Sequence, residues 1–246
     1  MDLAQWPVRE ARGDIVGLQC AATFGRWFVD AFRFLAVLSV QPRKNLPILL
    51  DAYLEEFSPD ERVTLWIKAF VAGWGADPIP LVRHRFGRDA PGCVVVTEPM
   101  APQAIRSLYH AADAVVSVSV EEGWGWTGLE SIASGVQTIL TDGPGHREYA
   151  TADACRLIPT RAVRMSDLPE IMAETRAHGL TPNAARHIRC GQPELGDVKR
   201  ALRAAYEQGS VLTAAQRKAQ KEIRDRFTTR HTAEVFLAAL SKRGLV

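Results

Sequence analysis

Two carboxylates flank a glycine-rich run in the sequence EEGWGWTGLESIASG, which spans residues 121–135. Glu122 and Glu130 enclose seven residues, and Gly123 and Gly125 lie between them. Glycines have no side chain, so a ligand can approach the backbone closely at these positions. Carboxylates are good acceptors for paired hydroxyl groups, such as those of a ribose or a hexose. The run therefore suits a ligand that carries sugars.

A helix is predicted directly after this run. The segment 127–135 has helical spacing and ends at Gly135, a typical C-terminal cap. If the helix begins near Trp126, its free N–H groups point back toward the loop and make that end partly positive, which suits a phosphate. Glu130 would then lie about one turn into the helix, and Glu122 would precede it. The local chemistry indicates a ligand with both a diphosphate and sugars.

A purely structural interpretation of the same run stays open. Trp124 and Trp126 would then form an aromatic loop that packs on the core, with Glu122 in solvent and Glu130 on an exposed face of the helix. A motif this short does not by itself decide between packing and binding. The order of the elements around it favours binding.

Strands and helices alternate along residues 34–160. Short apolar and β-branched runs predict strands at residues 34–40, 63–70, 92–99, 113–120, 136–142 and 155–159. Helical spacing predicts helices at residues 46–57, 102–112 and 127–135. This alternation is typical of a Rossmann-like α/β fold, a doubly wound parallel sheet with helices on both faces. Ligands of such sheets bind beyond the carboxyl ends of the strands, where the loop after the fourth strand would lie.

We expect three parts in the chain. Residues 1–33 show no steady period, and residues 34–160 form the α/β core. Residues 161–246 are expected to be a mainly helical C-terminal extension, with helices at residues 166–177, 195–208 and 213–240. The stretch 178–194 is predicted to be a loop or an insertion.

The composition is that of an ordinary globular protein, with 47% apolar and 24% charged residues. A net charge of +2 gives no broad field for nucleic acid. No signal-peptide pattern is present, and the apolar stretches are far shorter than the roughly 20 residues of a membrane span, so we expect a cytoplasmic protein. The four cysteines, at positions 20, 93, 155 and 190, form no C-x-x-C pair. They are expected to be buried thiols rather than disulfides or zinc ligands.

The stretch EGWGWTGLESIASGVQTILTDGPGHREY resembles the E-x7-E region of retaining glycosyltransferases with the GT-B fold, of the family-4 or group 1 type. Two upstream stretches, FLAVLSVQPRKNLPILLDAY and LYHAADAVVSVSVEEGW, are similar to other segments of that family. The resemblance covers residues 34–160 in the right order. It implies one Rossmann-like half of a GT-B enzyme, which binds a UDP-, GDP- or ADP-linked sugar without a cofactor or a metal.

The resemblance also implies roles for single residues. Glu130 would accept hydrogen bonds from the ribose, and Glu122 would face the transferred sugar in the catalytic site. Lys44 matches the lysine that neutralises the diphosphate, although a solvated turn lysine is an equal interpretation. Glu148 matches the acid of the family's G-x-x-E turn. Backbone amides of the loop would contact sugar or phosphate, at Gly123, Trp124, Gly125, Trp126 and Thr127.

The chain departs from the family at the end of the first predicted strand. The family has a glycine and an arginine there, and the arginine clamps the diphosphate, whereas this chain has Leu38 and Ser39. Lys68 is a candidate substitute, but a lysine with a buried stem and a surface amine is the plainer interpretation. His146 fits a surface turn better than a catalytic base.

The acceptor-binding half is a second departure. About 33 residues precede the first predicted strand, whereas one βαβ unit alone takes about 30 or more. One hypothesis is therefore a donor-binding domain for retaining, metal-independent transfer that works with a partner chain or is a fragment. The other is a non-catalytic binding module on a degenerate copy of the fold. A dinucleotide-binding oxidoreductase is disfavoured, because no G-x-G-x-x-G follows the first strand.

Overall fold

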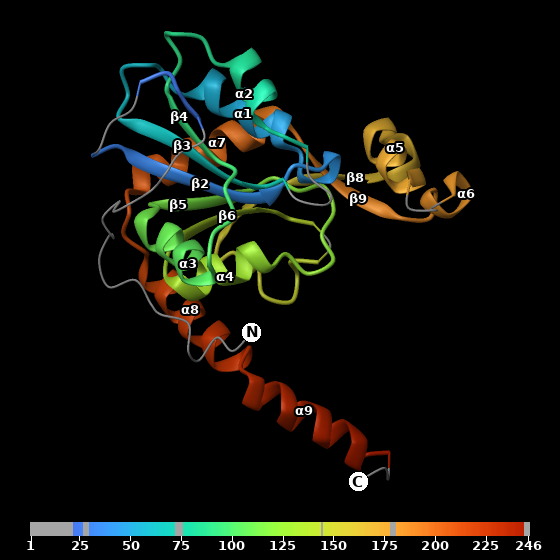
Figure 1. Cartoon of the computed structure of the whole chain (residues 1–246). Helices are drawn as coiled ribbons and strands as arrows, with labels where there is room; N and C mark the ends of the chain where they lie inside the picture. The colour runs from blue at the N-terminus through green and yellow to red at the C-terminus, as the bar shows by residue number, and fades with distance from the viewer. Residues whose placement is uncertain (1–21, 27–29, 72–75, 144, 178–180, 244–246) are drawn as a thin grey trace.

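The computed structural model describes residues 22–26, 30–71, 76–143, 145–177 and 181–243. Its centre is a seven-stranded sheet with the order β1-β4-β3-β2-β5-β6-β7 (Figure 1). The strands of this sheet are β1 (Ala22–Phe24), β2 (Phe32–Ser39), β3 (Val63–Phe70), β4 (Gly92–Val96), β5 (Ala114–Ser117), β6 (Gln137–Thr141) and β7 (Arg156–Ile158). All neighbours pair in parallel except β1, which pairs antiparallel with β4 at one edge.

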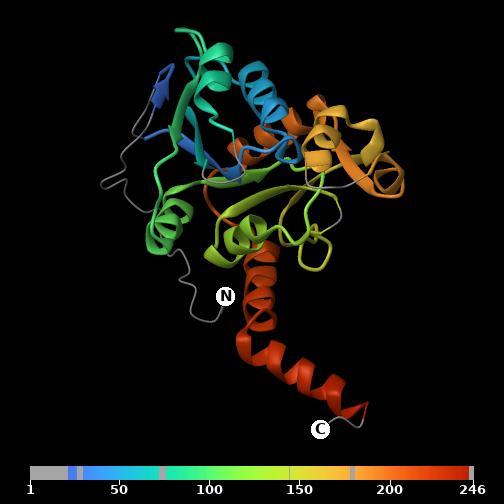
Figure 2. The same ribbon diagram turned by 45° about the vertical axis from the view of Figure 1, so that its right-hand side comes forward.

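Helices cover both faces of the sheet (Figure 1). One face carries α1 (Leu46–Glu56), α2 (Ile79–Arg85) and α7 (Leu195–Gln208). The other carries α3 (Pro102–Ala111), α4 (Trp126–Ser134) and α8 (Ala214–Arg226). The last helix, α9 (Thr229–Ser241), extends away from the body beyond α8 (Figure 2).

Alternate residues of the central strands supply the two cores. On β2, Phe34 and Ala36 pack under α1, whereas Leu35 and Val37 pack under α3 and α4. Period-two alternation with both faces apolar is what a strand covered on both sides requires. The predicted doubly wound α/β fold is therefore confirmed, and each of the six strands predicted within residues 34–160 is present.

The segment after Pro159 differs from the prediction. Helix was expected to follow this proline, but β8 (Thr160–Arg164) comes first, and it pairs antiparallel with β9 (Arg189–Pro193). The expected loop at residues 178–194 thus contains a strand. Between the two strands lie η3 (Met165–Asp167), α5 (Pro169–Ala177) and α6 (Pro182–Ala185). TRAVR has one buried apolar side chain, Val163, so its strand character comes from pairing rather than from an apolar pattern.

Three other differences are smaller. Helix α2 was not predicted, because its first turn contains a proline that resembles a break. The helix expected over residues 213–240 is divided into α8 and α9, and Thr228 caps α9 by accepting a hydrogen bond from the His231 amide. Helix α7 packs on the sheet beside α1, so the core extends beyond residue 160. The three-part domain division itself stays a prediction.

Three of the four cysteines are described, and Cys93, Cys155 and Cys190 are buried free thiols as expected. Burial raises the pKa of the Cys155 thiol to about 12 and that of the Cys190 thiol to about 11. Cys20 lies outside the described residues. Within the described ranges, no helix combines the length and the apolar character needed to cross a membrane.

Candidate functional site

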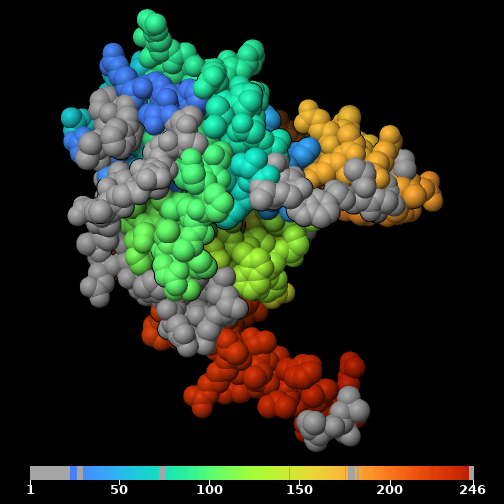
Figure 3. Space-filling model, viewed as in Figure 1, coloured from blue at the N-terminus to red at the C-terminus, as the bar shows by residue number. Residues whose placement is uncertain are grey.

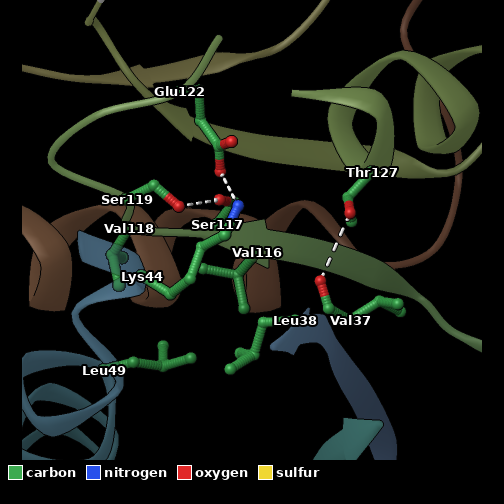
Figure 4. Close-up of a pocket in the computed structure, with 10 residues that line it drawn as sticks. All are labelled: Val37, Leu38, Lys44, Leu49, Val116, Ser117, Val118, Ser119, Glu122 and Thr127. Carbon is green, nitrogen blue, oxygen red and sulfur yellow. Dashed lines mark hydrogen bonds and ion pairs between the residues drawn. The ribbon is translucent and has the colours of Figure 1, made fainter. Parts of the chain in front are cut away.

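A pocket opens where the chain order of the sheet reverses. From β2 the chain proceeds to β3 and β4 on one side, and then returns to β5 and β6 on the other. In such sheets the switch point leaves a crevice beyond the carboxyl ends of the two central strands. The pocket lies there (Figure 4), and its lining residues come from β2, η2 (Pro42–Lys44), α1, β5, the loop after β5 and α4: Val37, Leu38, Lys44, Leu49, Val116, Ser117, Val118, Ser119, Glu122 and Thr127.

An ion pair forms one wall of this pocket. The Lys44 ammonium donates to Glu122 Oε1, and the Arg43 guanidinium lies 3.4 Å from Glu122 Oε2. Figure 4 shows Lys44 and Glu122 pointing toward one another across the pocket. Residues 78 positions apart in the sequence are thus brought together by the fold. Lys44 is therefore neither a free surface lysine nor an unpaired cation.

For both members of the Lys44–Glu122 pair, burial and the attraction of the partner shift the pKa in opposite directions. Burial raises the pKa of Glu122, but the charge and hydrogen bond of Lys44 outweigh burial and hold this pKa below its usual range. Burial lowers the pKa of Lys44, and the attraction of Glu122 opposes that shift without cancelling it. Charges buried together gain from each other about as much as they lose by leaving water. A ligand that offers each of them a new partner can therefore separate them at low cost.

The two glycines of the loop have different surroundings. Gly125 has a φ of 77° and lies at the N-cap of α4, where a Cβ would meet the His146 ring at 2.3 Å and the Tyr149 hydroxyl at 2.8 Å. The Tyr149 hydroxyl donates to the Gly125 carbonyl oxygen. Gly123 has open space where a Cβ would be. The backbone is therefore tightly held at Gly125 and accessible at Gly123, as a ligand-facing loop requires.

His146 lies beneath this loop and not on the surface. Its side chain is 2% exposed, so the expectation of a surface turn residue is wrong. Nδ1 donates to the Thr141 carbonyl oxygen at 3.2 Å, and burial lowers the pKa of the imidazole, which is therefore neutral at pH 7. The burial follows from Gly125, since only a residue without a side chain leaves room for the ring.

The two tryptophans of the loop do not line the pocket. Trp124 packs against Tyr149 and Phe227, with ring centroids 6.1 and 5.8 Å away, so part of the structural interpretation of this run holds. Trp126 is 53% exposed at the start of α4. Neither side chain is among the residues that line the pocket. The indole of Trp124 thus packs on other aromatic rings, and neither indole contributes to the pocket wall.

Glu130 lies one helical turn beyond Thr127, on the side of α4 that faces α3. The Tyr109 hydroxyl donates to its Oε2 at 2.8 Å. Burial raises the pKa of Glu130, and the hydrogen bond from Tyr109 and the charge of Arg106 oppose the shift. Thr127 lines the pocket and donates to the Val37 carbonyl oxygen at 3.2 Å. Residues three apart on a helix are neighbours, so Glu130 lies beside the pocket rather than in its lining.

Lys68 and Glu148 are not brought into the pocket lining. Lys68 is 1% exposed, so the expected surface amine is wrong, and its Nζ donates to the Ala69 carbonyl oxygen at 2.9 Å. Burial lowers the pKa of this ammonium. Glu148 is exposed and forms an ion pair with Arg226 of α8 at 3.0 Å. The binding roles expected for both residues stay predictions.

Several residues in and around the site were not predicted as members of it, among them Arg43, Tyr109, Ser119 and Tyr149. The lysine in PRKN was identified, and the neighbouring Arg43 could have been added on charge alone. Tyr109 reaches Glu130 from another helix, and no spacing in the sequence indicates that contact. Among the described residues, no group of three or more His, Cys, Asp or Glu side chains could hold a metal ion.

One curated protein is similar to part of this sequence. It is the alpha-monoglucosyldiacylglycerol synthase of Streptococcus pneumoniae (strain ATCC BAA-255 / R6), which is 30% identical over 110 residues. The match covers 45% of this chain and 24% of that protein. The similar region is therefore a small part of the longer protein.

Two solved structures share the fold. Anabaena HepE in complex with UDP and glucose is 17% identical, with a TM-score of 0.55 over 87% of this chain and 49% of that one. The pneumococcal O-GlcNAc transferase GtfA in complex with UDP and GlcNAc is 16% identical, with a TM-score of 0.54 over 96% of this chain and 38% of that one. The chain thus spans less than half the length of each of these proteins.

The family model of the Glycosyl transferases group 1 matches residues 31–175, which is more than half of the chain. The matched range includes every residue that lines the pocket and the whole of the E-x7-E run. The Rossmann-like sheet is also what one half of a GT-B glycosyltransferase contains. On this match the chain belongs to the group 1 glycosyl transferases.

Proposed function

We propose that this domain binds a nucleotide-diphospho-sugar and presents it for glycosyl transfer. The observation that carries the proposal is the Lys44–Glu122 pair in the wall of a pocket at the switch point of the sheet. A diphosphate is a new partner for Lys44, and sugar hydroxyls are new partners for Glu122. The ligand therefore replaces one internal ion pair by two external contacts.

The leaving group of this reaction is the nucleoside diphosphate. The bond between the sugar's anomeric carbon and the diphosphate oxygen breaks, an acceptor hydroxyl oxygen bonds to the same carbon, and the hydroxyl proton passes to the departing diphosphate. Lys44, Arg43 and the N-terminal amides of α4 supply positive charge where the diphosphate charge develops. We include independence of metal in the proposal, because these three groups supply the charge that a metal would otherwise provide. Retention of configuration is included on the resemblance of the E-x7-E run alone.

Glu130 is proposed to hold the ribose. Its carboxylate is oriented by Tyr109, and it lies beside Thr127, which lines the pocket. UDP is the favoured nucleotide, since both solved structures described above contain UDP. The acceptor half is proposed to come from a separate chain or from further sequence, because this chain spans less than half of those structures. A cytoplasmic location stays a prediction.

Titration calorimetry with UDP, GDP, ADP and their glucose conjugates tests the proposal. Glu130→Ala removes two hydroxyl contacts and is expected to weaken UDP binding roughly tenfold or more. Glu234→Ala, an exposed glutamate of α9 paired only with Arg230 among described residues, is the matched control and should leave the affinity unchanged. If no nucleotide binds and Glu130→Ala behaves as the wild type, the proposal is wrong.

A non-catalytic module remains the second candidate, and one observation favours it. Ser39 replaces the arginine expected from the family and donates to Gln41 Oε1 at 3.0 Å, so no cation occupies that position. Such a module would bind the nucleotide sugar without transferring it. Transfer of a labelled sugar, measured with the acceptor half present, distinguishes the two, since turnover contradicts the second candidate.

A further inference from the structure

Residues 160–193 form an arm that projects from the body (Figures 1 and 3). Its described parts are the β8–β9 hairpin and the helices α5 and α6. The arm has its own small apolar cluster, whose buried members are Val120 of the body and Val163, Met165, Ile171, Met172, Ala185 and Cys190. Because its apolar side chains pack together in this cluster, the arm is a folded substructure rather than an extended loop.

One surface of the arm is a basic hollow, lined by Arg164, Arg186, His187 and Arg189. Arg164 and Arg189 come from the paired strands, and the other two residues come from the turn between α6 and β9. All four are exposed. Among the residues that the structure describes, no acidic side chain lines the hollow.

The strand register places like charges opposite each other in this hollow. Arg164 and Arg189 are direct partners in the antiparallel ladder. Like charges directly opposite on two strands are destabilising. Within the described parts of the chain, none of the three arginines of the hollow forms an ion pair, whereas Arg161 on the same strand lies 3.6 Å from Glu194. Arg186 Nε donates to His187 Nε2 at 3.1 Å, which holds these two side chains together.

We propose that the basic hollow is a binding site for a phosphoryl group. Guanidinium groups present several donors in a planar fork that matches phosphate oxygens, and three arginines line this hollow. A bound phosphoryl group would offset the repulsion between Arg164 and Arg189. The same chemistry is offered by a soluble phosphate compound and by a phospholipid head group, and the experiment below separates these sources.

The arm is joined to the body beside the pocket loop. The Gly191 amide donates to the Val120 carbonyl oxygen at 2.8 Å, and the Val120 amide donates to the Arg43 carbonyl oxygen at 2.9 Å. Val120 thus connects the arm to η2 and directly precedes Glu121 and Glu122. A phosphoryl compound held on the arm would therefore be bound by a part of the chain that is hydrogen-bonded to the pocket loop. The inference stands without the proposed donor site, since it depends on the arm alone.

The test uses the full chain, with inorganic phosphate as the probe at constant ionic strength. Calorimetry and phosphate-dependent thermal unfolding are measured for the wild type, for the double variant Arg164→Gln/Arg189→Gln and for the control Arg161→Gln. Two charge-assisted contacts are lost in the double variant, so phosphate affinity should fall by about tenfold or more. The control removes one arginine of the same strand and should bind phosphate as the wild type does.

Two further readouts complete the test. Without phosphate, the double variant should unfold at the same or a higher temperature than the wild type, because repulsion across the hairpin is removed. Sedimentation with phosphatidylglycerol and phosphatidylcholine vesicles identifies the source: retention on anionic vesicles that the double variant loses indicates a lipid head group, and phosphate binding alone indicates a soluble compound. Absence of both kinds of binding, or an equal loss in Arg161→Gln, overturns the proposal.

Discussion

The molecule contains two clusters of basic side chains, one at the pocket and one on the arm, and their charges are balanced in different ways. Lys44 in the pocket wall and Arg43 beside it are partly buried and face Glu122. Arg164 and Arg189 in the basic hollow are exposed and face each other. In the first cluster the protein supplies the counter-charge, and in the second no residue that the structure describes does so.

Burial explains the difference. A charge removed from water must be paired within the protein, whereas an exposed charge is solvated and screened by salt. The groups of the pocket are therefore held in place by one another, and the ligand binding proposed for it would be an exchange of partners. The basic hollow would gain a partner outright, so the binding proposed for it should depend more steeply on ionic strength.

The largest expected effect concerns the loop before α4, where Gly125 is tightly enclosed and Gly123 is not. Gly125→Ala places a Cβ against the His146 ring at a φ of 77°, and we expect a loss of about 3 kcal/mol in the free energy of unfolding. Gly123→Ala is the matched control, because nothing lies within 4 Å of its Cβ, and it should cost less than about 1 kcal/mol. Urea unfolding measures both. Equal losses would show that the loop is not held at Gly125.

The core strands and the side-chain contacts of the pocket differ in how far the sequence predicts them. The strands of the core carry long apolar runs, and Gly135 ends α4 in the left-handed conformation expected of a C-terminal cap. The pocket loop follows from that pattern, because ligands bind beyond the carboxyl ends of parallel strands. The pattern does not reveal which side chains from distant segments contact one another. The Lys44–Glu122 pair and the burial of His146 depend on contacts between distant segments.

The arm was missed for a related reason. Its two strands are short, with a single apolar side chain facing inward on β8, and the connection between them contains two helices instead of a tight turn. No two-residue turn signal therefore marks the hairpin. The opposition of Arg164 and Arg189 follows only from the register of the strands, and a one-residue shift in register would separate them.

A second prediction compares a buried ion pair with an exposed one. Glu122→Gln leaves Lys44 partly buried without its counter-charge and should lower the free energy of unfolding by about 2 kcal/mol. Glu194→Gln makes the same change in the exposed pair with Arg161 on the arm and should cost less than about 0.5 kcal/mol. Urea unfolding at pH 7 checks both. If the two substitutions had equal effects, the proposed contrast between the clusters would be contradicted.

The smallest expected effect is the pH dependence of the difference in unfolding free energy between the wild type and Glu122→Gln. Because Lys44 holds the pKa of Glu122 below its usual range in the folded chain, Glu122 contributes stability above its unfolded pKa, and this contribution is lost as the pH falls through the folded value. Protonation in acid removes the charge that Glu122→Gln removes. The gap between wild type and Glu122→Gln, about 2 kcal/mol at pH 7, should therefore shrink to under about 1 kcal/mol at the lowest pH at which both remain folded. Unfolding by urea across this pH range measures the gap, and a gap that stays constant would mean that Lys44 stabilises the Glu122 side chain through contacts other than charge.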